Sequence, residues 1–143
     1  MVFAVVVAGL LGVLLVGITH SYSLSLNVGG ANKILTQWDR TEEVEVNYDN
    51  AALAIGTDVA IGVALDISQI RTICIVCDVA ATLKTNSSGA PQETLTLVAG
   101  IPFVWDASAP GATIGDYFAG DVTNIYVTNA AEAHLQIYTC LTS

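Results

Sequence analysis

The chain has 143 residues, enough for one domain with its own hydrophobic core. Hydrophobic residues make up 53 % of it and charged residues only 12 %, about half the usual charged share of a soluble domain. Thirteen Asp and Glu stand against four Lys and Arg, and no basic residue follows Lys84. Because phosphate backbones and anionic lipid surfaces are bound by clustered Lys and Arg, we expect no nucleic-acid partner and no polybasic membrane site.

The first segment, residues 2–18, is a continuous apolar run, and the first basic residue after it is Lys33. A signal peptide carries a basic region before its apolar stretch, whereas Val2 directly follows Met1. A transmembrane helix needs about 17–25 apolar residues and is oriented by basic flanks, so this run is at the short limit and lacks the flanks. We expect residues 1–18 to form an apolar arm buried against protein, with a membrane anchor as the alternative.

From Thr19 onward the pattern predicts strand after strand. In 21–28, 42–48 and 58–65, apolar residues alternate with polar or small ones, the period of a half-buried strand. Five further segments are rich in Thr, Val, Ile and Tyr and are predicted as strands: 71–77, 80–85, 93–99, 122–129 and 134–141. Clusters of Asn, Asp, Ser, Gly and Pro separate many of them and predict turns.

These elements predict an all-β fold, with residues 19–143 forming a single β-sandwich of about eight to nine strands. The segment 66–70 is expected to be at most one short helical turn. Four aromatic residues are expected to form a cluster that closes one end of the sandwich: Phe103, Trp105, Tyr117 and Phe118.

The cysteines do not predict a chemical site. Cys74 and Cys77 have CxxC spacing, but they lie in a predicted strand, where residues three apart face opposite sides with their Cα atoms about 10 Å apart. That separation is too long for a disulfide between them, which leaves a bond from one of them to Cys140 as an alternative. A zinc site needs further ligands held close, and Cys140, His20 and His134 are scattered along the chain.

The other candidate residues have simple structural interpretations. Glu43 and Glu45 fall on one strand face, which fits a solvated surface better than a cation site. Asp116 and Asp121 lack the spacing of a calcium loop, and 86–88 is an Asn-Ser-Ser glycosylation sequon of a kind that often arises by chance. The sequence contains no GxSxG, phosphate-loop or HExxH motif. We therefore expect no enzyme activity, no catalytic residues, no cofactor and no metal.

Several segments of the second half resemble a known group of proteins. The segments are 65–68 (LDIS), 81–91 (ATLKTNSSGAP), 97–105 (LVAGIPFVW) and 120–130 (GDVTNIYVTNA). They are similar to small, jelly-roll-like β-sandwich proteins encoded among bacteriophage structural genes, and the likeness covers about residues 20–143. It implies a virion component attached to a capsid or another particle surface, and it assigns no functional residue.

We therefore expect a virion structural protein, a minor capsid or decoration subunit, whose partners are its own copies and other virion proteins. The scarcity of charge agrees with this, because a monomer normally covers its surface with charged residues. One alternative is a membrane-anchored or filament-forming cell-surface protein that contacts lipid through residues 2–18. Another is a carbohydrate-binding sandwich that uses Trp38, Trp105 and Tyr117.

Overall fold

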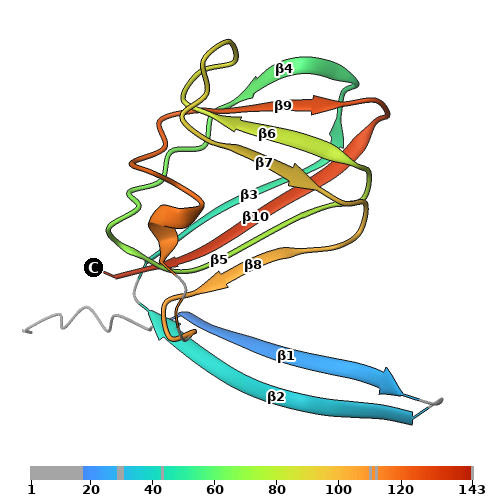
Figure 1. The fold of residues 1–143 in the computed structure, drawn as a ribbon, viewed down its shortest axis with the longest axis vertical. Coiled ribbons are helices and arrows are strands. Elements are labelled where there is room, and N and C mark those ends of the chain that lie inside the picture. The colour runs from blue at the N-terminus through green and yellow to red at the C-terminus, as the bar shows by residue number, and fades with distance from the viewer. Residues whose placement is uncertain (1–17, 29–30, 43, 110, 112, 143) are drawn as a thin grey trace, which may run out of the picture.

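A computed structural model of the chain describes residues 18–142 except 29–30, 43, 110 and 112 (Figure 1). For the segment that ends at residue 46 it describes the strand backbone and, of the side chains, only that of Ser21. The expected apolar arm lies almost entirely outside the described residues.

The described chain contains two four-stranded antiparallel sheets that face each other (Figure 1). The first sheet has the order β3-β10-β5-β8, with the bounds Val44–Leu53, Ala133–Leu141, Ile70–Cys77 and Phe103–Asp106. The second has the order β4-β9-β6-β7, with the bounds Gly56–Ile61, Ile125–Asn129, Ala81–Thr85 and Thr94–Leu97. The predicted all-β sandwich is confirmed.

The strand order is that of a jelly roll. When these eight strands are renumbered in chain order, the first sheet reads 1-8-3-6 and the second 2-7-4-5. Two interlocked Greek keys of this kind define the jelly roll, so the more specific fold expectation is also confirmed. The order brings β3 beside β10, which places the beginning and the end of the sandwich in contact.

A two-stranded hairpin precedes the sandwich and is a difference from the prediction. Strand β1 (Ile18–Val28) pairs with β2 (Ala31–Glu42), and Val28 lies opposite Ala31, so only two residues of sequence separate the strands. Those residues are Gly29 and Gly30, the composition favoured in two-residue hairpin connections. The sequence placed 21–28 in the sandwich and predicted no strand over 31–42. Figure 1 shows the hairpin extending away from the two sheets.

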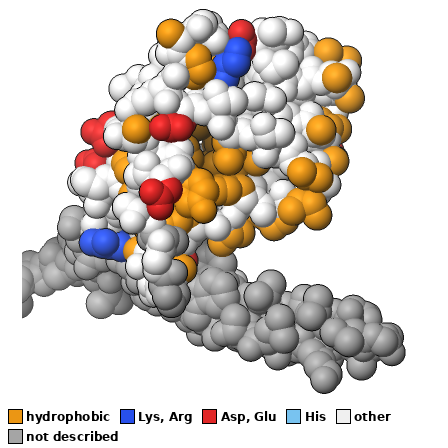
Figure 2. Space-filling view, in the orientation of Figure 1, with side chains coloured by type: hydrophobic (Ala, Val, Ile, Leu, Met, Phe, Trp, Pro, Cys, Tyr) orange, Lys and Arg blue, Asp and Glu red, His pale blue; other side chains and the backbone are white. Residues whose placement is uncertain are grey.

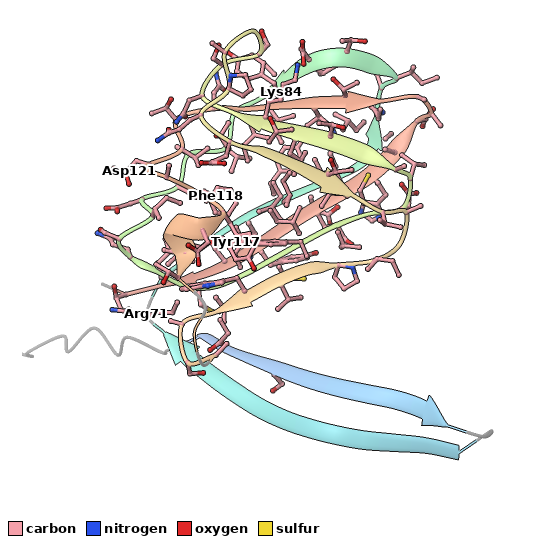
Figure 3. The ribbon with its side chains drawn as sticks, in the orientation of Figure 1. Arg71, Lys84, Tyr117, Phe118 and Asp121 are labelled. Atoms are coloured by element: carbon pink, nitrogen blue, oxygen red, sulfur yellow. The ribbon has the colours of Figure 1, made fainter. Side chains whose placement is uncertain are left out.

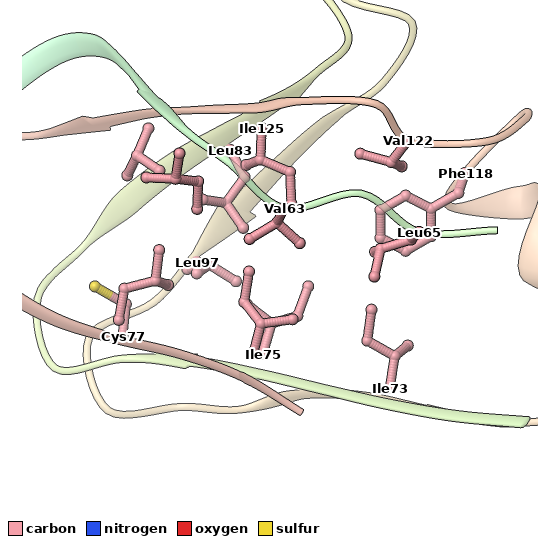
Figure 4. Close-up of a cluster of buried hydrophobic side chains, with 14 of the residues drawn as sticks. Val63, Leu65, Ile73, Ile75, Cys77, Leu83, Leu97, Phe118, Val122 and Ile125 are labelled. Carbon is pink, nitrogen blue, oxygen red and sulfur yellow. The ribbon is translucent and has the colours of Figure 1, made fainter. Parts of the chain in front are cut away.

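The core lies between the sheets and follows the period-two pattern. In β5, Ile73 and Ile75 face inward and are at most 1 % exposed (Figure 4). Leu135 and Ile137 of β10 and Val127 of the facing sheet are buried to the same extent. Burial of each such aliphatic side chain contributes about 1.5–3 kcal/mol. These side chains belong to one cluster between the two sheets.

The inward face of β4 continues past its last residue. Val63 and Leu65 are buried, and Leu65 forms an isolated bridge with Val122. On the opposite face, Ala60 and Ala64 are exposed, as the alternation over 58–65 predicts.

Three of the four predicted aromatic residues pack together along edge strand β8. The ring of Phe103 meets the rings of Tyr117 and Phe118 edge to face, at centroid distances of 5.1 and 6.4 Å. Tyr117 and Phe118 follow the 3-10 helix η1 (Ile114–Asp116), which directs both toward β8 (Figure 3). The segment 66–70, for which at most one short helical turn was expected, is a hydrogen-bonded turn.

Candidate interaction surface

Four short loops meet at one end of the sandwich, because the strands that precede and follow them are paired there. Ala133 lies opposite Leu53 in the first sheet, and Asn129 lies opposite Ala81 in the second. We call this surface the loop end (right-hand side of Figure 1). It consists of the loops β3–β4, β5–β6, β7–β8 and β9–β10, residues 54–55, 78–80, 98–102 and 130–132.

The loop end is apolar and almost uncharged. Ten of its thirteen residues are Ala, Val, Ile or Pro, and the other three are Asp78, Gly100 and Glu132. All are exposed except Val79, which is half-buried. Figure 2 shows hydrophobic side chains along this end and no charged ones on the face in view. Contiguous exposed apolar surface on a folded protein marks a site of interaction.

Three large side chains project from this surface. Ile55 is 65 % exposed, Val98 62 % and Ile101 60 %, the highest values among the large hydrophobic side chains that the structure describes. Turns are usually built from Gly, Asn, Asp and Ser, whose backbone preferences and hydrogen bonds suit them to solvent. Solvation therefore does not account for aliphatic residues at these positions.

The loops of this surface are held by hydrogen bonds. The side-chain amide of Asn129 donates to the carbonyl oxygens of Ala54 (3.2 Å) and Ala131 (2.6 Å), so it ties two loops together. The backbone N–H of Gly100 donates to the carbonyl of Cys77 (2.7 Å), which fixes a third loop to the end of β5. Gly100 has φ +68°, a conformation that costs glycine little. The apolar surface is thus built on a fixed backbone.

A shallow depression borders the loop end on the outer face of the second sheet. Its volume is about 220 Å³, and the loop residues Ala80 and Ala130 form part of its wall. Thr82, Thr96 and Thr128 line it from three adjacent strands, since Thr82 pairs with both of the others. Pockets for small-molecule ligands usually have about 300–1,000 Å³. This depression is better matched to an aliphatic side chain than to a cofactor.

The opposite end of the sandwich is polar, and its side chains pair with one another. Both polar atoms of the Asn86 side-chain amide form hydrogen bonds. Nδ2 donates to Gln92 Oε1 (2.5 Å) and to the carbonyl oxygen of Asp121 (2.9 Å), and Oδ1 accepts from the Thr123 N–H (2.7 Å). A glycan would be joined through that same Nδ2. The sequon at 86–88 therefore has a structural role in this fold.

The two basic side chains of the sandwich are those of Arg71 and Lys84. Figure 3 places Arg71 at the side opposite to the loop end and Lys84 near the middle of the upper edge, and Lys84 is three residues along β6 from Ala81 at the loop end. The ammonium group of Lys84 lies 2.8 Å from a carboxylate oxygen of Asp58, and its hydrogen bond is the main cause that lowers the pKa of that carboxyl. The loop end thus contains no basic side chain.

The CxxC pair lies in strand β5, as predicted. Cys77 faces the core and is fully buried, Cys74 faces outward and is half-buried, and neither forms a disulfide with the other or with Cys140. Cys74 pairs with Tyr138 and Cys140 with Thr72, so the strand register does not place Cys140 opposite either residue of the pair. Burial raises the pKa of the Cys74 thiol, which makes it a poorer nucleophile at neutral pH.

The acidic and histidine candidates serve local structure. His134 Nε2 lies 2.6 Å from Asp49 Oδ1, and this hydrogen bond is the main cause that lowers the pKa of the Asp49 carboxyl. The carboxylate of Asp121 accepts from the Ile67 N–H (3.0 Å), and that of Asp116 accepts from an N–H three residues earlier (3.4 Å). Within the part of the chain that the structure describes, no three His, Cys, Asp or Glu side chains form a group that could hold a metal ion.

Four of the sequence candidates lie where side chains are not described: His20, Trp38, Glu43 and Glu45. The aromatic residues proposed for sugar binding do not form a platform among the described residues, because Trp105 is only 6 % exposed and packs in the core. Tyr117 is 41 % exposed. The loop end itself was missed by the sequence analysis, although the aliphatic composition of its four turns was a usable signal.

Comparison of the chain with protein-family models, with curated proteins and with solved structures found no significant match. The likeness to bacteriophage structural proteins therefore depends on the four sequence segments alone. Over the described residues, no helix has the length and apolar character needed to cross a membrane.

Proposed function

We propose that this chain is a structural subunit of a virus particle, a minor capsid or decoration protein that acts by binding its own copies and other particle proteins. The observation that carries the proposal is the loop end, an ordered and exposed apolar surface on a jelly-roll sandwich. Jelly rolls form viral capsid proteins, but also lectins and cupins, so the fold supports the proposal without deciding it.

The energetics of such contacts agree with the composition of the chain. Complete burial of Ile55, Val98 and Ile101 against another protein stabilises the contact by roughly 1.5–3 kcal/mol for each side chain. Contacts of this kind need no catalytic residue, cofactor or metal, and we propose no chemical activity for the chain. In a particle the same contact is repeated many times, so that a modest gain for each copy becomes a stable assembly.

One alternative has a specific observation in its favour. The apolar run at 2–18 has the composition of a lipid-contacting segment, which supports a membrane-anchored or filament-forming surface protein. The carbohydrate-binding alternative has less support, because of its three aromatic residues Trp105 is buried.

Flotation and electron microscopy of the full-length chain separate the first two functions. The purified chain is mixed with vesicles of zwitterionic lipid, and in parallel with vesicles that contain anionic lipid, and each mixture is centrifuged through a density gradient. We expect regular protein assemblies that stay at the bottom with and without vesicles. Co-flotation of the protein with zwitterionic vesicles, without assemblies in the vesicle-free sample, would replace the virion proposal with the membrane one.

A further inference from the structure

We infer that the loop end is the surface through which one copy of this chain binds a second copy, loop end against loop end. The inference deepens the proposed function and rests on it for the premise that the copies assemble. Its observational basis is the charge, the shape and the hydrogen bonding of the thirteen loop-end residues.

The charge distribution disfavours an anionic partner. The loop end carries Asp78 and Glu132 and no Lys or Arg. Nucleic acid and anionic lipid bind through basic residues, so neither has a counter-charge here. A strongly basic protein would find only two carboxylates here, and that of Asp78 already accepts a hydrogen bond from the His134 N–H (2.7 Å).

The same distribution makes a second copy the best-suited occupant. The chain carries a net charge of −9, so two copies repel each other wherever their acidic surfaces meet. At the loop end, eleven of thirteen residues are uncharged. A contact there brings together only two acidic residues of each copy, Asp78 and Glu132, while it removes exposed aliphatic side chains of both copies from water.

The loop end has both projecting side chains and a depression at its border. It presents three projecting side chains, Ile55, Val98 and Ile101, beside a depression of about 220 Å³ whose wall includes Ala80 and Ala130. An aliphatic side chain of one copy can enter the depression of the other, which is the reciprocal pairing of a two-fold interface. Five small residues let the two backbones come close: Ala54, Ala80, Ala99, Ala130 and Ala131.

The hydrogen bonds of Asn129 and Gly100 reduce the conformational entropy that the loops lose on association. Loops that are already fixed lose little conformational freedom when a partner binds, so more of the burial free energy is retained as affinity. The surface is therefore prepared for binding before a partner arrives.

Sedimentation velocity of the full-length chain over a range of concentrations tests the inference. The variants are Ile101→Asp and Val98→Asp in the loop end, with Val104→Asp as the matched control, because Val104 is 43 % exposed on the outer face of β8. We expect wild type and the control to associate alike. A loop-end variant should raise the dissociation constant of self-association at least roughly thirtyfold, the effect of an interface hot spot. Thermal melts verify that each variant is folded.

Thiol cross-linking gives a second measurement that leaves the surface largely intact. Ile101→Cys is compared with Ala90→Cys, an exposed position at the polar end, and with wild type, whose half-buried Cys74 sets the background. With a short bis-maleimide we expect a cross-linked dimer from Ile101→Cys and background levels from the other two.

The outcomes separate this inference from the proposed function. If wild type associates but the loop-end variants associate equally well, or all three Asp variants lose association alike, the loop end is not the contact and the proposed function stands. Background cross-linking of Ile101→Cys in an associating sample leads to the same conclusion. If the wild-type chain is a monomer at every concentration, both proposals are overturned.

Discussion

Replacement of Asn86 tests the polar end of the sandwich, where one side chain joins three segments of the chain. Asn86 has φ +64°, in the left-handed region, and its amide contacts Gln92, Asp121 and Thr123. Asn86→Gly removes the side-chain hydrogen bonds and keeps the backbone conformation accessible. Asn86→Ala removes the same bonds and adds the strain of a Cβ in the left-handed region.

The magnitudes follow from these contacts. The Asn86 amide makes four hydrogen bonds, two of them to Thr123. At the low end of roughly 0.5–1.5 kcal/mol each, as fits a partly exposed site, their loss costs about 2 kcal/mol. Strain for alanine is about 1–2 kcal/mol, partly offset by the roughly 0.4–1 kcal/mol by which alanine restricts the unfolded chain relative to glycine. We expect Asn86→Ala to lose about 3 kcal/mol and Asn86→Gly about 0.5–1 kcal/mol less.

Urea denaturation of the wild type and both variants measures the difference, with circular dichroism as the signal. Equal slopes and a shifted midpoint are expected, since the folded state keeps its size. If Asn86→Gly were as stable as wild type, the hydrogen-bond network would contribute nothing. If Asn86→Ala were the more stable variant, the left-handed conformation would be wrong.

Three further predictions concern the core, the thiols and the hydrogen bond between Asp49 and His134. Ile137→Ala should lower the free energy of unfolding by about 2–5 kcal/mol, because Ile137 is 1 % exposed. Ala64→Ser, at an exposed position, should change it by at most about 0.5 kcal/mol, and equal denaturation midpoints for the two variants would refute the assigned core. Iodoacetamide should modify Cys74 before the buried thiols of Cys77 and Cys140, and only slowly below about pH 8.5 because burial raises the pKa of the Cys74 thiol. If peptide mapping finds a buried thiol modified first, Cys74 does not face outward from β5. The pKa of the Asp49 carboxyl is lowered in the folded state, so its ionised form stabilises the fold fully above the ordinary pKa of 3.8, and this stabilisation is lost as the pH falls through the lower folded-state pKa. His134→Ala should raise the pKa of Asp49 in an NMR titration, and an unchanged pKa would exclude the hydrogen bond as the cause.

The strands of the sandwich were largely predictable from local pattern. The segments 71–77 and 80–85 were predicted as strands from their content of Thr, Val and Ile, and the structure has β5 and β6 there. Strand β8 was missed because it has only four residues, Phe103–Asp106, too few for a period to be recognised. Strand β2 was missed because Ile34 and Leu35 are adjacent and interrupt the alternation.

The candidate surface could not be predicted in the same way, because it is made by topology. Residues 54–55 and 130–132 are far apart in the sequence and become neighbours only because Leu53 pairs with Ala133. No local pattern contains that pairing, which depends on the packing of both whole sheets. What the sequence does contain is the contrast between the turn at 86–91, with Asn, Ser, Gly and Pro, and the aliphatic turn at 98–102.

The mass of the full-length chain in solution tests the central claim, that this protein works by assembly, most directly. Light scattering coupled to size-exclusion chromatography gives that mass over a series of loading concentrations. We predict an average mass that approaches a whole-number multiple of 14.9 kDa greater than one at high concentration and falls toward 14.9 kDa on dilution. A mass of 14.9 kDa at every concentration would contradict the account.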